Sequence, residues 1–381
     1  MRLKIAVVML VLLLAACGGR PEPVVLPTVA FEATEAVNDT AATVTPPPRS
    51  IPTLPPPRDT VQRTSARQVA VVSAAGAVNA ELLVENEIYI ADVQGRSARM
   101  TTNAGVDRGA VWSPDGDTLY FTSDGEGTAY IYTLNVSNTN PVQRLSPFPS
   151  GDEREPTLAP TGAEIAFTSD RTGSANIYRM NAFDGRGLQT LTTGEGVNTQ
   201  PTWSPDNTWI AFVSERDGNA EIYAMTTTGE QITRLTDNPA TDTQPAFSPD
   251  GRRLAFISDR DGAPQVYLMN LPEPRPAFED DRRGQSFDLL SGDIPPLDLS
   301  TEESAPDIIR VTGDNDRPKE HPGWYVTAEG RMGLVYTAVV AGTDGEQRRQ
   351  TYLANDDGSN VQTVGGLQGS FTQGAVRPLQ R

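Results

Sequence analysis

The stretch Ala110-Val-Trp-Ser-Pro-Asp-Gly, followed two residues later by Leu119-Tyr-Phe-Thr-Ser-Asp, decides the fold because the 381-residue chain repeats it. Further copies of the first part begin at Pro156, Pro201 and Pro245, and each is followed by an Ala-Phe run that ends in Ser-Asp or Ser-Glu. The prolines of the four copies lie 46, 45 and 44 residues apart, and they are Pro114, Pro160, Pro205 and Pro249. An internal repeat of this length indicates a repeat architecture.

Each repeat predicts four short strands. A third apolar run carries a tyrosine, and a fourth run such as Thr233-Arg-Leu-Thr closes the unit. Pro-Asp-Gly and Asp-x-x-Gly segments separate the runs, and these residues are typical of tight turns. Four-stranded units repeated at about 45 residues are typical of β-propeller blades, each of which buries its faces against its neighbours.

The two ends of the chain predict how the ring closes. Gln68-Val-Ala-Val-Val-Ser and Glu87-Ile-Tyr-Ile lack a first strand before them, and Thr372-Gln-Gly-Ala-Val-Arg-Pro resembles the missing one. A last repeat begins at Pro322 and ends at the run Asn360-Val-Gln-Thr-Val. We therefore predict an all-β fold over 68–381, a six-bladed β-propeller of four-stranded antiparallel blades whose ring is closed by the C-terminal strand.

The first residues predict a lipoprotein signal peptide over 1–16. Arg2 and Lys4 precede ten apolar residues, which are too few to span a bilayer as a helix. Leu14-Ala-Ala-Cys resembles the bacterial lipobox, in which the cysteine, here Cys17, is lipidated and becomes the N-terminus. The alternative is an ordinary secretory signal with a coincidental cysteine. Either way the chain is expected outside the cytoplasm, and the lipobox places it on a membrane of the bacterial cell envelope, in the periplasm or at the cell surface.

Residues 17–67 are predicted to be a disordered tether that carries the lipidated Cys17. The part from 18 to 67 holds 10 Pro and 8 Thr and shows no apolar periodicity. Its Pro-Pro-Pro clusters favour extended polyproline conformations, which suit a spacer. Binding of these clusters to an aromatic groove, or O-glycosylation of the threonines, are alternatives that stay open.

Charge and residue counts exclude several functions. The chain has 31 basic and 49 acidic residues, for a net charge of −18, which argues against a nucleic-acid partner. One Cys and one His cannot supply a zinc site of four Cys and His ligands, nor a metal site with several histidines. An insertion at 272–307 holds 10 Asp and Glu against 3 Arg and is expected between the third and fourth strands of its blade. It is interpreted as a solvated loop or as an acidic docking surface.

At the repeats quoted above, the chain resembles the TolB-type propeller family, a relative of the WD-repeat class. The resemblance covers about 68–381 and is densest over 105–271, where the Trp-Ser-Pro-Asp-Gly motif and its copies stand. It implies a propeller fold, and it is weak for function because propellers of this family serve many roles. We expect a lipid anchor and a tether in place of the N-terminal α/β domain that TolB carries, so the resemblance does not imply the Tol-specific partnership.

Aligning the repeats brings one position of each first strand to the mouth of the central channel. Gly109, Glu155, Gln200, Gln244, His321 and Gln373 occupy it. We expect a binding face made of these and neighbouring residues, namely Asp107, Arg108, Glu153, Arg154, Glu155, Gln200, Asp242, Gln244, Glu320, His321 and Gln373. The recurring glutamine also fits a structural hydrogen bond between blades, and His321, aligned with Gln200 and Gln244, then shares that structural role. Trp112, Trp203 and Trp324 occupy one repeat position and are interpreted as core residues between blades.

The function predicted from these features is that of a non-enzymatic lipoprotein whose propeller binds an envelope protein or peptide. We expect a monomeric propeller with no cofactor. Two alternatives remain. One is a calcium-dependent hydrolase or lactonase in the channel, because carboxylate oxygens alone can bind calcium. The other is a structural spacer of the cell surface.

Overall fold

The computed structural model describes residues 68–73, 87–92, 97–102, 105–136, 142–194, 196–272, 299, 307–313, 317–327, 330–341, 347–363 and 371–376. The chain divides into two units, Met1–Arg49 and Ser50–Arg381. The predicted signal peptide, Cys17 and the tether lie outside the described residues. Within the described part, no helix is long and apolar enough to cross a membrane.

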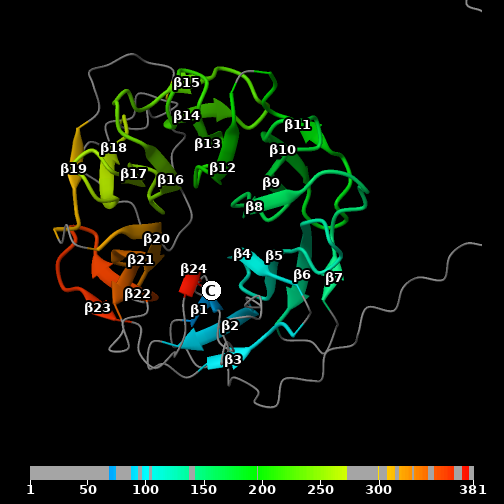
Figure 1. Ribbon diagram of the computed structural model, residues 1–381, viewed down its shortest axis with the longest axis horizontal. Coiled ribbons are helices and arrows are strands. Elements are labelled where there is room, and N and C mark those ends of the chain that lie inside the picture. The colour runs from blue at the N-terminus through cyan, green and yellow to red at the C-terminus, as the bar shows by residue number, and fades with distance from the viewer. Residues whose placement is uncertain are drawn as a thin grey trace, which may run out of the picture. The chain divides into compact units, whose positions relative to one another are not determined.

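Five blades are each built from four consecutive antiparallel strands, ordered from the channel outward (Figure 1). The first contains β4 (Asp107–Trp112), β5 (Thr118–Ser123), β6 (Tyr130–Asn135) and β7 (Gln143–Arg144). The second contains β8 (Glu153–Leu158), β9 (Glu164–Ser169), β10 (Asn176–Asn181) and β11 (Gln189–Thr190). The third contains β12 (Asn198–Trp203), β13 (Trp209–Ser214), β14 (Glu221–Thr226) and β15 (Thr233–Arg234). The fourth contains β16 (Asp242–Phe247), β17 (Arg253–Ser258), β18 (Gln265–Asn270) and β19 (Ile308–Arg310). The fifth contains β20 (Lys319–Val326), β21 (Met332–Ala341), β22 (Gln347–Asn355) and β23 (Gln362–Thr363).

The remaining described strands form a composite sheet from the two ends of the chain. Its order is β24 (Phe371–Val376), β1 (Gln68–Ser73), β2 (Glu87–Asp92) and β3 (Ser97–Arg99). β24 pairs antiparallel with β1 and contacts β4 on one side and β20 on the other. The prediction of six blades is therefore wrong: the described chain has five blades of consecutive strands, and a sheet shared by its two ends lies between the fifth and the first.

Aromatic pairs across the second and third strands fill the blades. In four blades a phenylalanine of the second strand lies opposite the tyrosine of the third, with ring centroids 5.9 to 6.0 Å apart. The fifth blade uses Tyr336 and Tyr352 at 5.6 Å. Such cross-strand pairs stabilise a sheet beyond their burial alone. Because each blade is covered on both faces, its second strand is buried at nearly every position, as in β13.

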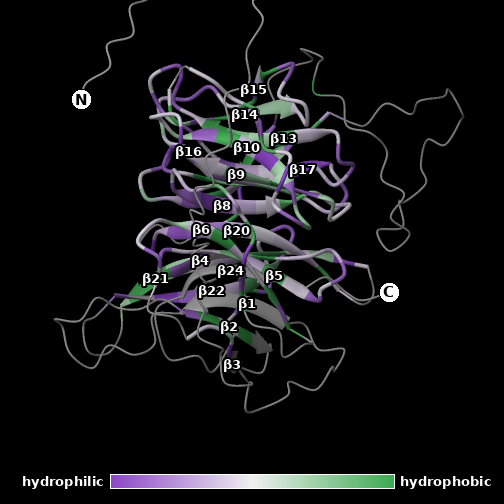
Figure 2. Cartoon of the chain, turned by 90° about the vertical axis from the view of Figure 1, so that its right-hand side faces the viewer, coloured by the Kyte–Doolittle hydropathy of each residue, from purple (hydrophilic) through white to green (hydrophobic). Residues whose placement is uncertain are grey.

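The Ser-Pro-Asp-Gly motif closes the turn between the first two strands. Ser113 Oγ accepts a hydrogen bond from the Thr118 N–H at 2.9 Å and donates to Asp115 at 2.5 Å. Ser204 and Ser248 make the same pair of bonds in the third and fourth blades. The motif therefore repeats because it builds the turn. Figure 2 shows hydrophobic residues on parts of the strands and mainly hydrophilic residues in the described loops that join them.

The predicted tryptophan positions lie between blades, as expected. Trp112 and Trp203 are buried, and the Trp203 indole N–H donates to the Thr157 carbonyl of the preceding blade at 3.1 Å. Trp324 makes the equivalent bond to Ala246 at 3.0 Å. The acidic insertion separates β18 from its partner β19, as predicted. Most of it lies outside the described residues, but Leu299 is buried in the apolar cluster of the third and fourth blades.

Candidate functional site

Three carboxylates predicted for the binding face are buried inside the blades. Asp107, Glu153 and Asp242 occupy the first position of their strands and are 0% exposed. Arg171 donates to Glu153 at 2.7 Å, and Arg260 donates to Asp242 at 2.8 Å. Their assignment to the binding face is therefore wrong, because a partner at the surface cannot reach them.

The arginines that pair with Glu153 and Asp242 follow the Ser-Asp turns of their repeats. The Arg171 guanidinium also lies over Phe167 and Tyr178, 5.5 and 5.0 Å from the ring centroids. Arg216 and Arg260 stack in the same way on the aromatic pairs of their blades. In the third blade the partner of Arg216 is the neutral Asn198, at 3.1 Å. This recurring arginine was the sequence signal that the strand-start acids are structural.

Burial affects the charge of Asp242 even with its arginine nearby. Removal from water raises the pKa of the Asp242 carboxyl above its ordinary value, although the hydrogen bond from Ser258 and the charge of Arg260 oppose this shift. Its Oδ1 has no hydrogen-bond partner among the described residues. Asp242 is thus a buried acid paired with Arg260 inside its blade, and its burial opposes its ionisation.

The residues at the channel position link the blades through hydrogen bonds. Glu155 Oε2 accepts from the Gln200 N–H at 2.8 Å, Gln200 Oε1 accepts from the Gln244 N–H at 2.7 Å, and Gln244 Oε1 accepts from the His321 N–H at 2.5 Å. All four have positive φ, from 53° to 56°, and Gly109 at the same position has φ 62°. Each occupies an irregularity in the first-strand pairing. The structural hydrogen bond considered for the repeated glutamine is confirmed.

His321 contributes its backbone to this series, in line with the structural role considered for it. Its Nδ1 is buried without a hydrogen-bond partner among the described residues and lies 3.9 Å from Glu320 Oε2. Burial lowers the pKa of the imidazole to about 4, although the Glu320 carboxylate opposes the shift. Glu320 itself accepts from Arg349 at 2.7 Å. The imidazole is therefore neutral at physiological pH.

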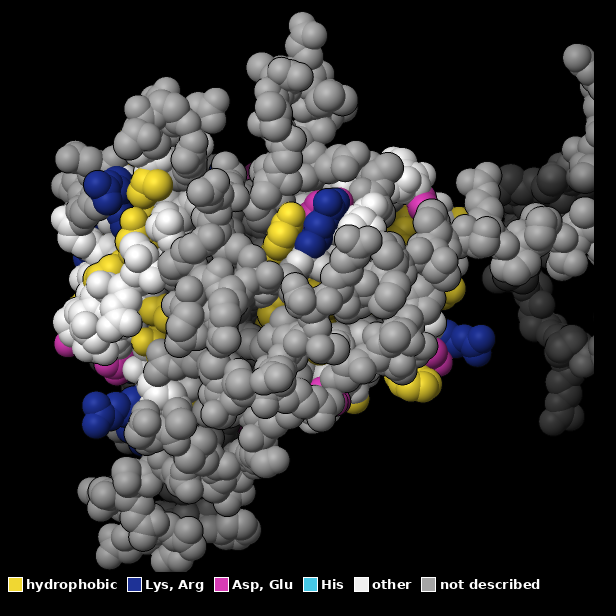
Figure 3. Space-filling view, turned by 90° about the horizontal axis from the view of Figure 1, so that it is seen from below, with side chains coloured by type: hydrophobic (Ala, Val, Ile, Leu, Met, Phe, Trp, Pro, Cys, Tyr) yellow, Lys and Arg dark blue, Asp and Glu magenta, His cyan; other side chains and the backbone are white. Residues whose placement is uncertain are grey.

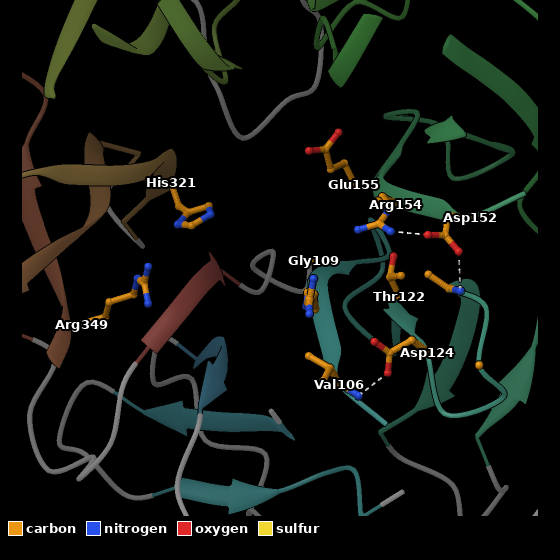
Figure 4. Close-up of a pocket in the computed structure, with 12 residues that line it drawn as sticks. Val106, Gly109, Thr122, Asp124, Asp152, Arg154, Glu155, His321 and Arg349 are labelled. Atoms are coloured by element: carbon orange, nitrogen blue, oxygen red, sulfur yellow. Dashed lines mark hydrogen bonds and ion pairs between the residues drawn. The ribbon is translucent and has the colours of Figure 1, made fainter. Parts of the chain in front are cut away.

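A cavity of about 460 Å³ opens at the channel mouth (Figure 4). Gly109 and Thr122 of the first blade and Arg154 and Glu155 of the second form one side, and His321 and Arg349 of the fifth blade lie across from them. A second cavity of about 240 Å³ follows the first strands of the five blades and shares Gly109, Glu155 and His321 with the first. The mouth and the channel are thus lined by the same positions.

The acids that line the mouth bind neighbouring groups of the protein. Asp124 accepts from the Val106 N–H at 2.7 Å. Asp152 accepts from the Ala129 N–H at 3.0 Å and forms an ion pair with Arg154. Burial would raise the pKa of Asp152, but these two partners lower it below the ordinary value. Arg108 is exposed, and no ion pair joins it to a described residue.

The structure thus brings together part of the predicted face. Arg108, Arg154, Glu155 and His321 line the mouth, and Gln200 and Gln244 line the second cavity. Glu320 lies beside the mouth through its bond to Arg349, and the side chain of Gln373 lies outside the described residues. The mouth also contains Thr122, Asp152 and Arg349, which were not predicted. Asp152 precedes the strand by one residue and fits the alignment, whereas Arg349 is in β22, where the repeat motif is weak.

No group of three or more His, Cys, Asp or Glu side chains in the described part of the chain is arranged to hold a metal ion. Each carboxylate that lines the mouth accepts a hydrogen bond from a protein N–H or is paired with an arginine. The chemistry open to this site is therefore hydrogen bonding and charge pairing with a polar ligand.

The family model described as the TolB beta propeller domain matches residues 139–232 and 188–277. Among solved structures, the chain is similar to TolB from Acinetobacter baumannii, with a TM-score of 0.60 and 17% identity over 82% of this chain and 67% of that one. A protein assigned as TolB from Agrobacterium tumefaciens has a TM-score of 0.56 and 19% identity, over 80% and 91%. A chain of the nidogen/laminin complex has a TM-score of 0.55 and 12% identity, over 83% and 100%. At these identities the structural similarities show the fold, a TolB-like propeller.

Proposed function

We propose that the protein is a lipid-anchored envelope protein whose TolB-like propeller binds a protein or peptide at the channel mouth, without catalysing a reaction. The observation that carries the proposal is the 460 Å³ cavity, into which charged side chains from three blades open. Concave sites with a few converging polar groups are the usual places for ligands. The match to the TolB propeller family and the lipobox at Cys17 support an envelope location.

The chemistry of the mouth favours recognition over catalysis. His321 is the only histidine of the chain, and its low pKa makes it a poor base at neutral pH. Glu153 and Asp242 are paired with arginines inside the blades. Arg108 is an exposed cation beside backbone and hydroxyl donors, and Arg154 is exposed although it pairs with Asp152. The partner is therefore expected to present polar and acidic side chains at this face.

The test uses exposed positions, because substitution of the buried acids would damage the fold. Arg108→Glu and Arg154→Glu should each weaken capture of a partner from an envelope extract by the full-length protein about threefold to tenfold, as is usual for exposed interface charges. The matched control is Arg186→Glu, an exposed arginine in the loop after β10 and outside the mouth. The proposal fails if a partner is captured equally well by all three variants, or if none is captured by the unaltered protein.

Lipid anchoring needs a separate test. Labelling of growing cells with an alkyne fatty acid should mark the unaltered protein, and Cys17→Ala should abolish the label and release the chain from the membrane fraction. Membrane retention of the Cys17→Ala variant would contradict the anchor without affecting the propeller. In Figure 3, which views the propeller from the edge near the composite sheet, the described side chains in sight are small, separate groups of basic, acidic and apolar residues.

A further inference from the structure

The series of hydrogen bonds between blades stops at Gly109. At three consecutive junctions, a Glu or Gln side-chain oxygen accepts from the backbone N–H at the same position of the next blade. By this pattern the residue at 109 would serve the Glu155 N–H. Glycine has no side chain that could accept this hydrogen bond. No other side chain of the described residues accepts a hydrogen bond from the Glu155 N–H either. The junction between the first and second blades is therefore built differently from the three that follow it.

Thr122 shows the same deficit from the neighbouring strand. Its counterpart in the second blade, Thr168, donates to Glu155 Oε2 at 2.7 Å. Thr122 is 5% exposed, and its Oγ1 has no hydrogen-bond partner among the described residues. A buried hydroxyl left without a partner is costly, and such groups often mark a place where something binds. The Thr168 hydroxyl and the Gln200 N–H thus share an acceptor in Glu155. The equivalent donors one blade earlier, the Thr122 hydroxyl and the Glu155 N–H, lack that acceptor because residue 109 is glycine.

Both donors lie on the wall of the mouth cavity. Gly109, Thr122 and Glu155 line the 460 Å³ cavity together with Arg108 and Arg154 (Figure 4). We call Gly109, the Thr122 hydroxyl and the Glu155 N–H the Gly109 notch. It is open to a ligand from the channel mouth, and cations flank it.

We propose that the Gly109 notch receives the side-chain oxygen of a glutamate or glutamine of a bound peptide, in the place where the neighbouring blades use their own Glu155, Gln200 and Gln244. The ligand oxygen accepts from the Glu155 N–H and from Thr122, just as Glu155 Oε2 accepts from the Gln200 N–H and from Thr168. Glutamate is favoured over glutamine, because a carboxylate makes the stronger hydrogen bond and Arg108 and Arg154 flank it. This inference rests on the proposed function, since it names the side chain by which the partner would enter the mouth.

The experiment measures binding of single-residue probes to the full-length protein by NMR or calorimetry. The probes are N-acetyl-glutamate methylamide, N-acetyl-glutamine methylamide and, as an apolar control, N-acetyl-leucine methylamide. The glutamate and glutamine probes should bind and the leucine probe should not. Gly109→Gln fills the notch from within, and it should weaken probe binding at least about tenfold, the equivalent of one to two hydrogen bonds. The conformation is accessible to glutamine, because Gln200 and Gln244 have φ values of 55° and 56°.

Two further variants make the result specific. Gly109→Ala adds a methyl group that cannot reach either donor, so it serves as the stability reference that shares the cost of a Cβ at positive φ with Gly109→Gln. Glu155→Gly removes the acceptor of both the Gln200 N–H and the Thr168 hydroxyl and should create a second notch, detected as a second equivalent of bound probe. Gly109→Gln should also raise the unfolding temperature relative to Gly109→Ala, because it restores the missing bond.

The outcomes separate this inference from the proposed function. If neither polar probe binds, or if Gly109→Gln leaves their binding unchanged, the notch is not the site and the inference is wrong. If the captured partner is lost on Arg108→Glu but retained on Gly109→Gln, the proposed function stands and the notch inference fails. If probes bind in the notch while no partner is captured, the proposed function fails and the notch remains a site for the oxygen of free glutamate-like solutes, which free glutamate and glutarate would then detect.

Discussion

In the second and fourth blades, an arginine pairs with the buried acid at the start of the first strand. Arg171, Arg216 and Arg260 share the same stacking on a Phe–Tyr pair, but Arg171 and Arg260 face a buried carboxylate and Arg216 faces an amide. Comparing the three positions therefore separates the stability that the stacking of the arginine contributes from the stability that its charge contributes. Removing one partner of a buried pair leaves the other charged and unsolvated, which costs more than the pair itself contributes.

Arg260→Leu is expected to destabilise the protein by about 3 kcal/mol, because Asp242 is left without its cation. Arg216→Leu should cost about 1 kcal/mol, since it removes only a hydrogen bond and stacking next to neutral Asn198. Urea unfolding at pH 7 measures both. The pKa of Asp242 is already raised, so the folded protein takes up a proton at higher pH than the unfolded chain, and the deficit of Arg260→Leu should shrink as the pH falls toward 4. Equal losses in the two variants would show that stacking, not charge, dominates.

His321 offers a direct reading of burial at the channel position, because it is the only histidine of the chain. Its imidazole C–H signal in an NMR titration should move with an apparent pKa of about 4, well below the ordinary 6.5. Between these two pKa values His321 is protonated in the unfolded chain and neutral in the folded protein. This residue therefore costs stability as the pH falls from 6.5 toward 4. His321→Gln, which copies the other blades, should remove that part of the acid sensitivity. A titration near 6.5 would place the ring in water.

At the scale of strands, the sequence predicted the elements well because the repeat reports turns and aromatic pairs directly. The Ser-Pro-Asp-Gly turns, the Phe–Tyr pairs and the closing pairing of β24 with β1 follow from motifs visible along the chain. The candidate site was predicted less well. Glu153 and Asp242 look like surface acids in the sequence, but each pairs inside its blade with an arginine from a loop 18 residues later. Arg349, which lies in β22, also lines the mouth, and no sequence motif predicted its position there.

β24 is expected to be essential, because it supplies the first strand of the composite sheet and contacts both neighbouring blades. A chain ending at residue 370 exposes the edge of β1 and should lose several kcal/mol together with cooperative unfolding. A chain ending at residue 376 keeps β24 and is the matched control, expected to unfold like the full-length protein. Circular dichroism during thermal unfolding compares them. A sharp, unshifted transition of the shorter chain would mean that the ring holds without its closing strand.

At the scale of the whole molecule, a net charge of −18 is divided between charges that the fold neutralises and charges that solvent screens. Arginines pair with Glu153, Asp242 and Glu320, and the mouth mixes both signs, so the acidity does not make this face an anionic site. The overall charge therefore predicts a general response to ionic strength, with no preference for a particular cation.

Calcium provides the test of that view, since hard cations prefer clustered oxygen ligands and gain affinity from a preformed site. The unfolding temperature in CaCl₂ should equal that in NaCl of the same ionic strength, and a chelator should leave it unchanged. A cation that binds only the folded state stabilises it by about 2.7 kcal/mol at a hundredfold excess over its dissociation constant, which would raise the unfolding temperature by several degrees. A rise specific to calcium, lost on Asp124→Asn or Asp152→Asn and kept on the exposed Asp184→Asn, would place a cation at the mouth and revive a metal-dependent activity there.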